Sequence, residues 1–106
     1  MTVKYYCYFP NCSYEASSKA LIDEHHILPK ALGGSNKASN LITLCPSHHR
    51  RIYCREATEG FHSIIHEDSI EILGKLSSSN GLILHYVDLK EGVEKYYSLR
   101  TRKILD

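Results

Sequence analysis

Three cysteines and a histidine in the first half of this 106-residue chain constrain its fold more than any other feature. Cys7 and Cys12 flank a Phe-Pro-Asn segment, which predicts a tight turn. Cys45 precedes His48 by three residues at an expected helix start, so about one helical turn of 3.6 residues brings both side chains to one face. Thiolate and imidazole are the ligands that a tetrahedral structural zinc prefers. The pattern therefore predicts a zinc knuckle with four ligands: Cys7, Cys12, Cys45 and His48.

Two alternatives accompany this zinc site. Cys54 could replace Cys12 or His48 as a ligand, although we expect it to pack as a small apolar residue. In the second alternative, the four cysteines are unrelated buried thiols that bind no metal, and the histidine is exposed. The start of the chain resembles no signal peptide, and no stretch is long enough to cross a membrane. We therefore expect a cytoplasmic protein without a membrane partner, in a reducing compartment that favours zinc ligation over disulfides.

Length and a hydrophobic content of 42% predict one small domain over residues 1–106. We expect a zinc knuckle and core over residues 1–58 and a β-rich extension over 59–106. Charge is uneven: residues 1–55 carry seven Lys/Arg against three Asp/Glu, a net +4, whereas 56–106 carry six against nine, a net −3. The basic half suits local contact with phosphates.

The expected fold class is α+β. A strand over 21–28 ends at Pro29, and an exposed loop over 30–40 carries Gly33-Gly34. A second strand over 40–44 leads into a helix that starts at Pro46 and runs to about Arg55. The remaining runs predict a C-terminal antiparallel hairpin or meander, with turns at Asn80-Gly81 and Lys90-Glu91-Gly92 and strands over 61–66, 69–76, 82–89 and 93–100.

A run of histidines, glycines and one asparagine in the first half carries a family resemblance. It reads Glu24-His25-His26-Ile27-Leu28-Pro29, then Gly33-Gly34, then Asn40-Leu41-Ile42-x-Leu44-Cys45-x-x-His48-His49. In this order and at these separations, the residues resemble the HNH endonuclease family. Cys7 and Cys12 extend the resemblance to its zinc-bearing branch, so it covers about the first half of the chain.

The resemblance implies a ββα-metal core with a treble-clef-like structural zinc. It implies that His25 and His49 hold a catalytic divalent ion and that His26 is the general base. Asn40 would pin the loop and so help to orient His26. The implied activity is metal-dependent hydrolysis of DNA, which we expect to be double-stranded, with 5′-phosphate and 3′-hydroxyl ends as products.

The chemistry of phosphodiester hydrolysis agrees with these roles. The reaction needs a base with a pKa near neutrality, which histidine has, and a divalent ion that stabilises the charge on the phosphate. His48 and His49 point about 100° apart on a helix, so we expect them to serve different metals. Many family members carry another histidine where this chain has Tyr53. Two protein ligands suit Mg²⁺ or Mn²⁺, with other divalent ions open.

The adjacent histidines also predict an irregular strand. On a regular strand, His25 and His26 face opposite sides of the sheet, yet both must approach one phosphate. We therefore expect the strand to twist or break near Pro29 and the glycine loop.

Other residues leave alternatives open. Four basic residues either contact nucleic acid or form a solvated face: Lys30, Lys37, Arg50 and Arg51. His62 and His66 are expected to be structural or surface histidines. The activity could serve restriction, homing or phage DNA processing, and a homodimer would allow both strands to be cut. The alternative function is a non-catalytic treble-clef zinc module that binds nucleic acid or protein.

Overall fold

The computed structural model describes residues 3–79 and 81–105. They form a mixed chain dominated by strands, with one α-helix and several 3-10 turns among the described residues. The chain divides into two compact units, Met1–His49 and Arg50–Asp106. None of the described helices has the length and apolar character needed to cross a membrane.

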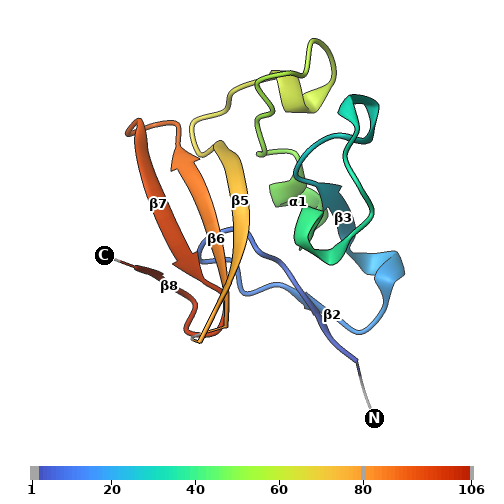
Figure 1. The fold of residues 1–106 in the computed structure, drawn as a ribbon, viewed down its shortest axis with the longest axis vertical. Helices are drawn as coiled ribbons and strands as arrows, with labels where there is room; N and C mark the ends of the chain where they lie inside the picture. The colour runs from blue at the N-terminus through green and yellow to red at the C-terminus, as the bar shows by residue number, and fades with distance from the viewer. Residues whose placement is uncertain (1–2, 80, 106) are drawn as a thin grey trace. The chain divides into compact units, whose positions relative to one another are not determined.

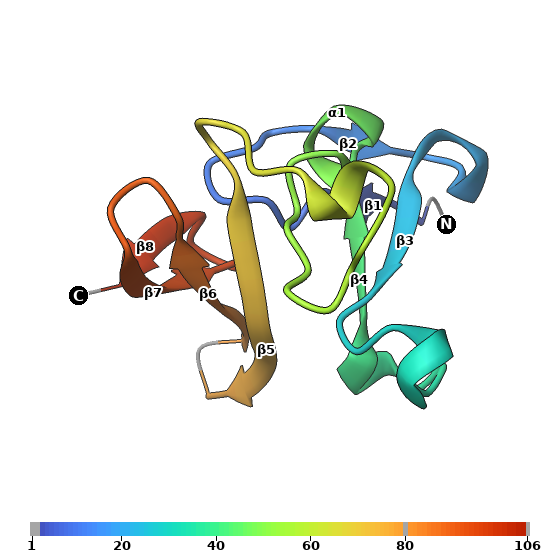
Figure 2. The same cartoon turned by 90° about the horizontal axis from the view of Figure 1, so that it is seen from above.

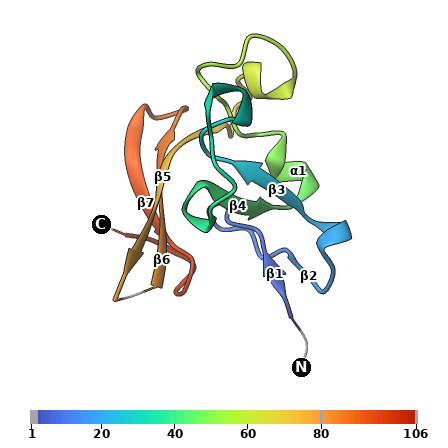
Figure 3. The same cartoon turned by 45° about the vertical axis from the view of Figure 1, so that its right-hand side comes forward.

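The first unit contains two short antiparallel strand pairs. Strand β1 (Tyr5–Tyr6) pairs with β2 (Glu15–Ala16), and β3 (Asp23–His26) pairs with β4 (Leu41–Leu44). Figure 3 shows the two pairs next to each other, where the amide of Tyr8 donates to the carbonyl of Thr43 at 2.9 Å. Alternate residues of β4 are buried, as a strand period of two requires. The apolar core of this unit comprises Cys7, Phe9, Ala16, Ile22, Ile42, Leu44 and Cys45.

The loop between β3 and β4 is exposed, as expected, and contains two 3-10 turns, Lys30–Leu32 and Ala38–Asn40. It extends from one end of the β3–β4 pair, while α1 lies at the other end (Figure 2). Gly33 has a φ of +91°, the left-handed region that favours glycine. A Cβ on Gly34 would lie 1.8 Å from the carbonyl oxygen of Leu28. The glycine pair therefore lets the loop fold tightly against its own start.

The helix after β4 is much shorter than expected. Helix α1 spans Pro46–His49, so the expectation of a helix to about Arg55 is wrong. Ile52 is 1% exposed and forms a parallel bridge with Ile70. The amide of Tyr53 donates to the Ile70 carbonyl at 2.9 Å, and the Ile70 amide donates to the Arg51 carbonyl at 3.2 Å. These sheet-type hydrogen bonds and the burial of a β-branched side chain compete with helix continuation.

The second unit is built on an antiparallel meander, as expected, but its fourth strand was not predicted. Its strands follow one another in the order β5-β6-β7-β8 and lie side by side in Figure 1. Their bounds are Ile70–Ser78, Gly81–Asp88, Val93–Ser98 and Lys103–Leu105. The core of this unit comprises Ile52, Ile70, Leu84, Tyr86 and Tyr97. Asn80 of the expected first turn lies outside the described residues.

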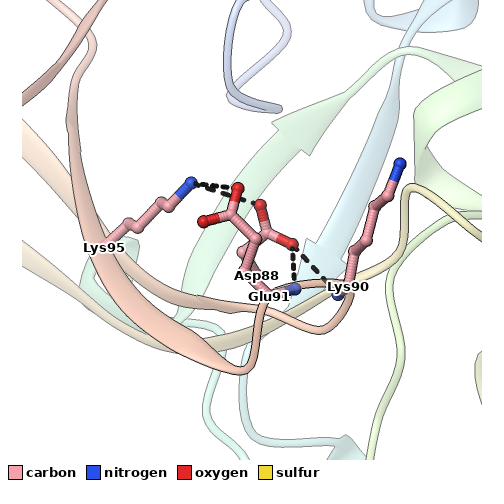
Figure 4. A network of polar contacts seen from close by, with 4 residues as sticks. All are labelled: Asp88, Lys90, Glu91 and Lys95. Atoms are coloured by element: carbon pink, nitrogen blue, oxygen red, sulfur yellow. Dashed lines mark hydrogen bonds and ion pairs between the residues drawn. The ribbon is translucent and has the colours of Figure 1, made fainter.

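The turn between β6 and β7 is held by polar contacts around Asp88 (Figure 4). One Asp88 oxygen accepts from the amides of Lys90 at 3.0 Å and Glu91 at 3.3 Å, and the other accepts from Lys95 Nζ at 3.3 Å. Lys95 also pairs with the Glu91 carboxylate at 3.2 Å. Gly92 has a φ of +69° and donates its amide to the Asp88 carbonyl at 2.7 Å. The expected turn at residues 90–92 is confirmed.

Two segments of this unit differ from expectation. Residues 61–66 form no strand: Phe61–Ser63 is a 3-10 turn after Gly60, whose φ is +82°. The His62 ring donates from Nδ1 to the Ile52 carbonyl at 2.7 Å, which ties this turn to the chain before it. Strand β8 was not anticipated, because the sequence pattern predicted no strand beyond residue 100. A left-handed Arg102, with a φ of 57°, turns the chain back so that β8 pairs with β7.

Candidate functional site

The structure brings the four expected zinc ligands together in the first unit. Their ligand atoms all lie within 4.8 Å of one another: Cys7, Cys12, Cys45 and His48. The expected turn is closed by a hydrogen bond from the Cys12 amide to the Phe9 carbonyl at 3.0 Å. At the start of α1, Nδ1 of His48 lies 3.4 Å from Sγ of Cys45. The knuckle and the helix start thus supply two ligands each, a set that could bind a metal such as zinc.

Backbone amides surround the three sulfur atoms. Sγ of Cys12 accepts from the Tyr14 amide at 3.5 Å, and Sγ of Cys45 accepts from the His48 amide at 3.4 Å. Burial raises the pKa of the Cys7 thiol, and backbone hydrogen bonds from Cys45 and Phe9 oppose that shift. Amide donors favour a thiolate, whereas burial without a cation disfavours it. The cluster therefore suits sulfur ligands whose charge is balanced by a metal ion.

Phe9 is a part of this cluster that the sequence did not reveal. Its ring stacks on the His48 imidazole with centroids 4.2 Å apart and planes 6° from parallel. Phe9 is 8% exposed, so the Phe9 side of this contact is buried. Stacking restricts the rotation of His48 and so holds its ring in one orientation. The position of Phe9 between Cys7 and Cys12 was the signal for this contact in the sequence.

A second cluster in the same unit joins His25, His49 and Asp23. Nδ1 of His25 lies 3.3 Å from Nε2 of His49, and the two rings meet edge to face. Nδ1 of His49 donates to Oδ2 of Asp23 at 2.9 Å. That donation leaves Nε2 of His49 with a lone pair directed toward His25. A carboxylate on the outer nitrogen of a histidine is the usual support of a metal-binding imidazole.

Asp23 was missed by the sequence analysis, although a signal was present. Asp23 and His25 are two residues apart on β3, so a regular strand places both side chains on one face. His25 is 5% exposed, and this face meets the helix that carries His49. Asp23 and His49 are 26 residues apart, so their contact depends on the fold and could not be predicted from residue spacing alone.

Strand β3 is regular up to its last residue, His26, and the chain bends directly afterwards at Ile27 and Leu28, before Pro29. The strand pairs with β4 in continuous register through His25↔Ile42 and His26↔Leu41. His25 and His26 are adjacent in this strand and have different partners. Nε2 of His26 contacts Oδ1 of Asn36, in the β3–β4 loop, at 2.8 Å. The loop that follows this bend brings a polar group to His26.

Asn40 anchors that loop through three backbone groups. Its Oδ1 accepts from the Leu28 amide at 2.8 Å, and its Nδ2 donates to the Leu28 carbonyl at 3.1 Å. Nδ2 also donates to the Ser35 carbonyl at 2.8 Å. Asn40 therefore ties the end of the loop to its start and to its middle, next to Asn36.

The remaining candidates lie as follows. Lys30 and Lys37 are exposed in the β3–β4 loop, and Arg50 is exposed at the start of the second unit. Arg51 forms an ion pair with Asp68 at 3.4 Å. Cys54 belongs to the second unit, where burial raises the pKa of its thiol. The four-ligand cluster is complete without Cys54.

Comparison with known proteins finds a family match in the first half of the chain. Residues 7–51, less than half of the chain, match the family model described as HNH endonuclease. The match points to a nuclease or other nucleic-acid-related function. The matched segment contains both clusters.

One curated relative is Anaredoxin from Nostoc sp. (strain PCC 7120 / SAG 25.82 / UTEX 2576), which is 39% identical over 49 residues. The match covers 46% of this chain and 62% of the relative, so the chain spans less than two thirds of that protein's length. No solved structure matches the chain.

Proposed function

We propose that this chain is a metal-dependent DNA endonuclease that hydrolyses phosphodiester bonds with one catalytic divalent ion. The observation that carries the proposal is the 3.3 Å separation of the His25 and His49 nitrogens within the segment that matches the HNH endonuclease family. Two nitrogens that each lie about 2.0–2.1 Å from one ion are about 2.8–3.4 Å apart, for ligand angles from octahedral to tetrahedral. The pair is thus spaced as two ligands of one ion would be.

In this proposal, each polar residue has a distinct role. His25 and His49 hold the ion, and Asp23 fixes the His49 ring. A bound ion supplies positive charge to the phosphate and the leaving oxygen. His26 takes a proton from the attacking water, for which a neutral imidazole is suited at physiological pH. The water oxygen bonds to phosphorus and the bond between phosphorus and O3′ breaks, so the products carry 5′-phosphate and 3′-hydroxyl ends.

The donor set bears on the choice of catalytic ion. We inferred Mg²⁺ or Mn²⁺ from a small number of protein ligands, but both ligands here are imidazoles. Imidazole sites prefer ions such as Ni²⁺ or Zn²⁺, and affinity rises from Mn²⁺ to Ni²⁺ along the divalent series. We therefore propose that Mn²⁺ and Ni²⁺ support cleavage at lower concentrations than Mg²⁺.

The proposal includes the architecture around the site. Cys7, Cys12, Cys45 and His48 bind a structural zinc, and β3, β4 and α1 form a ββα-metal core in one HNH domain over residues 1–106. The substrate is double-stranded DNA, whose phosphates are contacted by Lys30, Lys37, Arg50 and Arg51. A homodimer would bring two active sites to the two strands.

Conversion of supercoiled plasmid to open circles or linear DNA tests the activity. The expected result is conversion by the wild-type protein with Mn²⁺, Ni²⁺ or Mg²⁺, loss of conversion with a chelator, and a decrease of about 100-fold or more in His26→Ala. His66→Ala is the matched control, because it removes a histidine outside the proposed site, and it should cut like wild type. DNA retention without cleavage under any ion would favour the non-catalytic zinc module.

A further inference from the structure

We infer that Asn36 is a positioning residue that holds the His26 imidazole in the tautomer able to accept a proton from water. The inference rests on the proposed nuclease function and extends it to a residue outside the motif. It starts from the contact between Nε2 of His26 and Oδ1 of Asn36 at 2.8 Å.

The chemistry of the contact selects one tautomer. A neutral imidazole carries one ring hydrogen, on either Nδ1 or Nε2. An amide oxygen has lone pairs and no hydrogen, so a hydrogen bond to Oδ1 requires the hydrogen on Nε2. Nδ1 of His26 is then left with a lone pair, which is the group that a general base needs. The opposite tautomer would point an N–H at the water and could not accept its proton.

The loop that carries Asn36 is anchored immediately beside it. The carbonyl of Ser35 accepts from Asn40 Nδ2 at 2.8 Å, and Oγ of Ser35 accepts from the Lys37 amide at 3.3 Å. Asn40 is itself held by both backbone groups of Leu28, two residues after His26. These contacts connect Asn40 to His26 through the Ser35-Asn36 peptide. Asn40 thereby influences His26 by placing Asn36.

A double-mutant cycle on plasmid cleavage tests whether Asn36 acts through His26. Removing the acceptor in Asn36→Ala should lower kcat about 3- to 10-fold, with KM little changed, because the net contribution of one hydrogen bond is modest. Asn36→Asp keeps an acceptor oxygen and should recover most of the lost rate. Ser39→Ala, a matched change in the same exposed loop, should cut like wild type.

In the His26→Ala background, Asn36→Ala should cause no further loss of residual cleavage. An equal loss in both backgrounds would show that Asn36 acts on folding or DNA binding and would overturn the inference. Failure of Asn36→Asp to exceed Asn36→Ala would also overturn it. Thermal unfolding of each variant separates loss of rate from loss of folded protein.

A spectroscopic measurement tests the tautomer without any cleavage. In ¹⁵N-histidine-labelled protein with its metals bound, at a pH where the ring is neutral, His26 should show a protonated Nε2 and an unprotonated Nδ1. Asn36→Ala should shift the ring toward a mixture of tautomers. A wild-type ring protonated at Nδ1 would overturn the inference. Absence of wild-type cleavage together with the expected tautomer would support the hydrogen-bond assignment and overturn the nuclease function.

Discussion

Asp23 and His49 are joined across 26 residues by a hydrogen bond of 2.9 Å from Nδ1 to the carboxylate. The bond fixes the tautomer of His49 and turns Nε2 toward His25. Because both partners lie in the first unit, the site geometry depends on the β3–β4 pair and the start of α1. We therefore expect Asp23 to affect the affinity of the His25–His49 pair for a metal ion.

We expect Asp23→Asn to weaken binding of the catalytic ion about 10- to 100-fold, as loss of an outer carboxylate does at other histidine sites. The neutral amide can still accept a hydrogen bond but no longer stabilises positive charge on the imidazole. Titration of zinc-loaded protein with Mn²⁺ by calorimetry measures the change. Glu24→Gln, on the opposite face of β3, is the control and should bind Mn²⁺ like wild type. Equal dissociation constants for Asp23→Asn and wild type would contradict this role.

Metal content distinguishes the structural zinc ligands from the fourth cysteine. Purified wild-type protein should hold one zinc per chain, detected by mass spectrometry under native conditions. Cys45→Ser should lose it and unfold at a lower temperature, because binding energy at a structural zinc is also folding energy. Cys54→Ser should retain the zinc. Retention in Cys45→Ser, or loss in Cys54→Ser alone, would show that the ligand set is wrong.

Gly34→Ala tests the tight loop that carries Asn36 and Asn40. A Cβ would meet the Leu28 carbonyl oxygen at 1.8 Å, so the backbone must move. We expect the free energy of unfolding to fall by about 1–3 kcal/mol, the range for overpacked sites. Gly74→Ala is the matched control, because no atom lies within 4 Å of its added Cβ. Chemical denaturation of both variants checks the difference, and equal midpoints would mean that the loop is not constrained in this way.

Asp88→Asn tests the polar contacts in the second unit and their pH dependence. Burial raises the Asp88 pKa, but hydrogen bonds from Glu91, Lys95 and Lys90 outweigh it and hold the pKa below its ordinary value of 3.8. The charge therefore stabilises the folded state above that value, and the effect disappears as pH falls below it.

At pH 7, we expect Asp88→Asn to lower the free energy of unfolding by about 0.5–1 kcal/mol, a range that allows for solvent screening. The gap to wild type should close as the pH is lowered toward 3 and below. Thermal unfolding of both proteins at pH 7, 5 and 3 measures this difference in stability. A gap of constant size across this range would show that the Asp88 charge contributes nothing.

The spacing of residues in the sequence predicted the features that are formed by residues close together in the chain. The Cys7–Cys12 turn, the Cys45–His48 helix start and the turn at residues 90–92 each follow from short-range geometry. The helix was predicted too long because Ile52 has a partner, Ile70, that is distant in sequence. Propensity does not detect such a bridge.

The same reason explains what the sequence missed in the site. Asp23 contacts His49 and Asn36 contacts His26 only after the chain has formed the β3–β4 pair and its loop. The strand break expected at His25 and His26 was inferred to bring both rings to one phosphate. Pairing with β4 is regular through His26, where β3 ends and the chain bends, and the loop supplies the polar partner of His26.

Cleavage of a defined DNA duplex, with the product ends mapped by sequencing and ligation, tests the central claim most directly. With Mn²⁺ or Ni²⁺, wild-type protein should produce 5′-phosphate and 3′-hydroxyl ends, and His26→Ala should produce at least about 100-fold less product. No cleavage with any divalent ion, or equal cleavage by folded His26→Ala, would contradict the account.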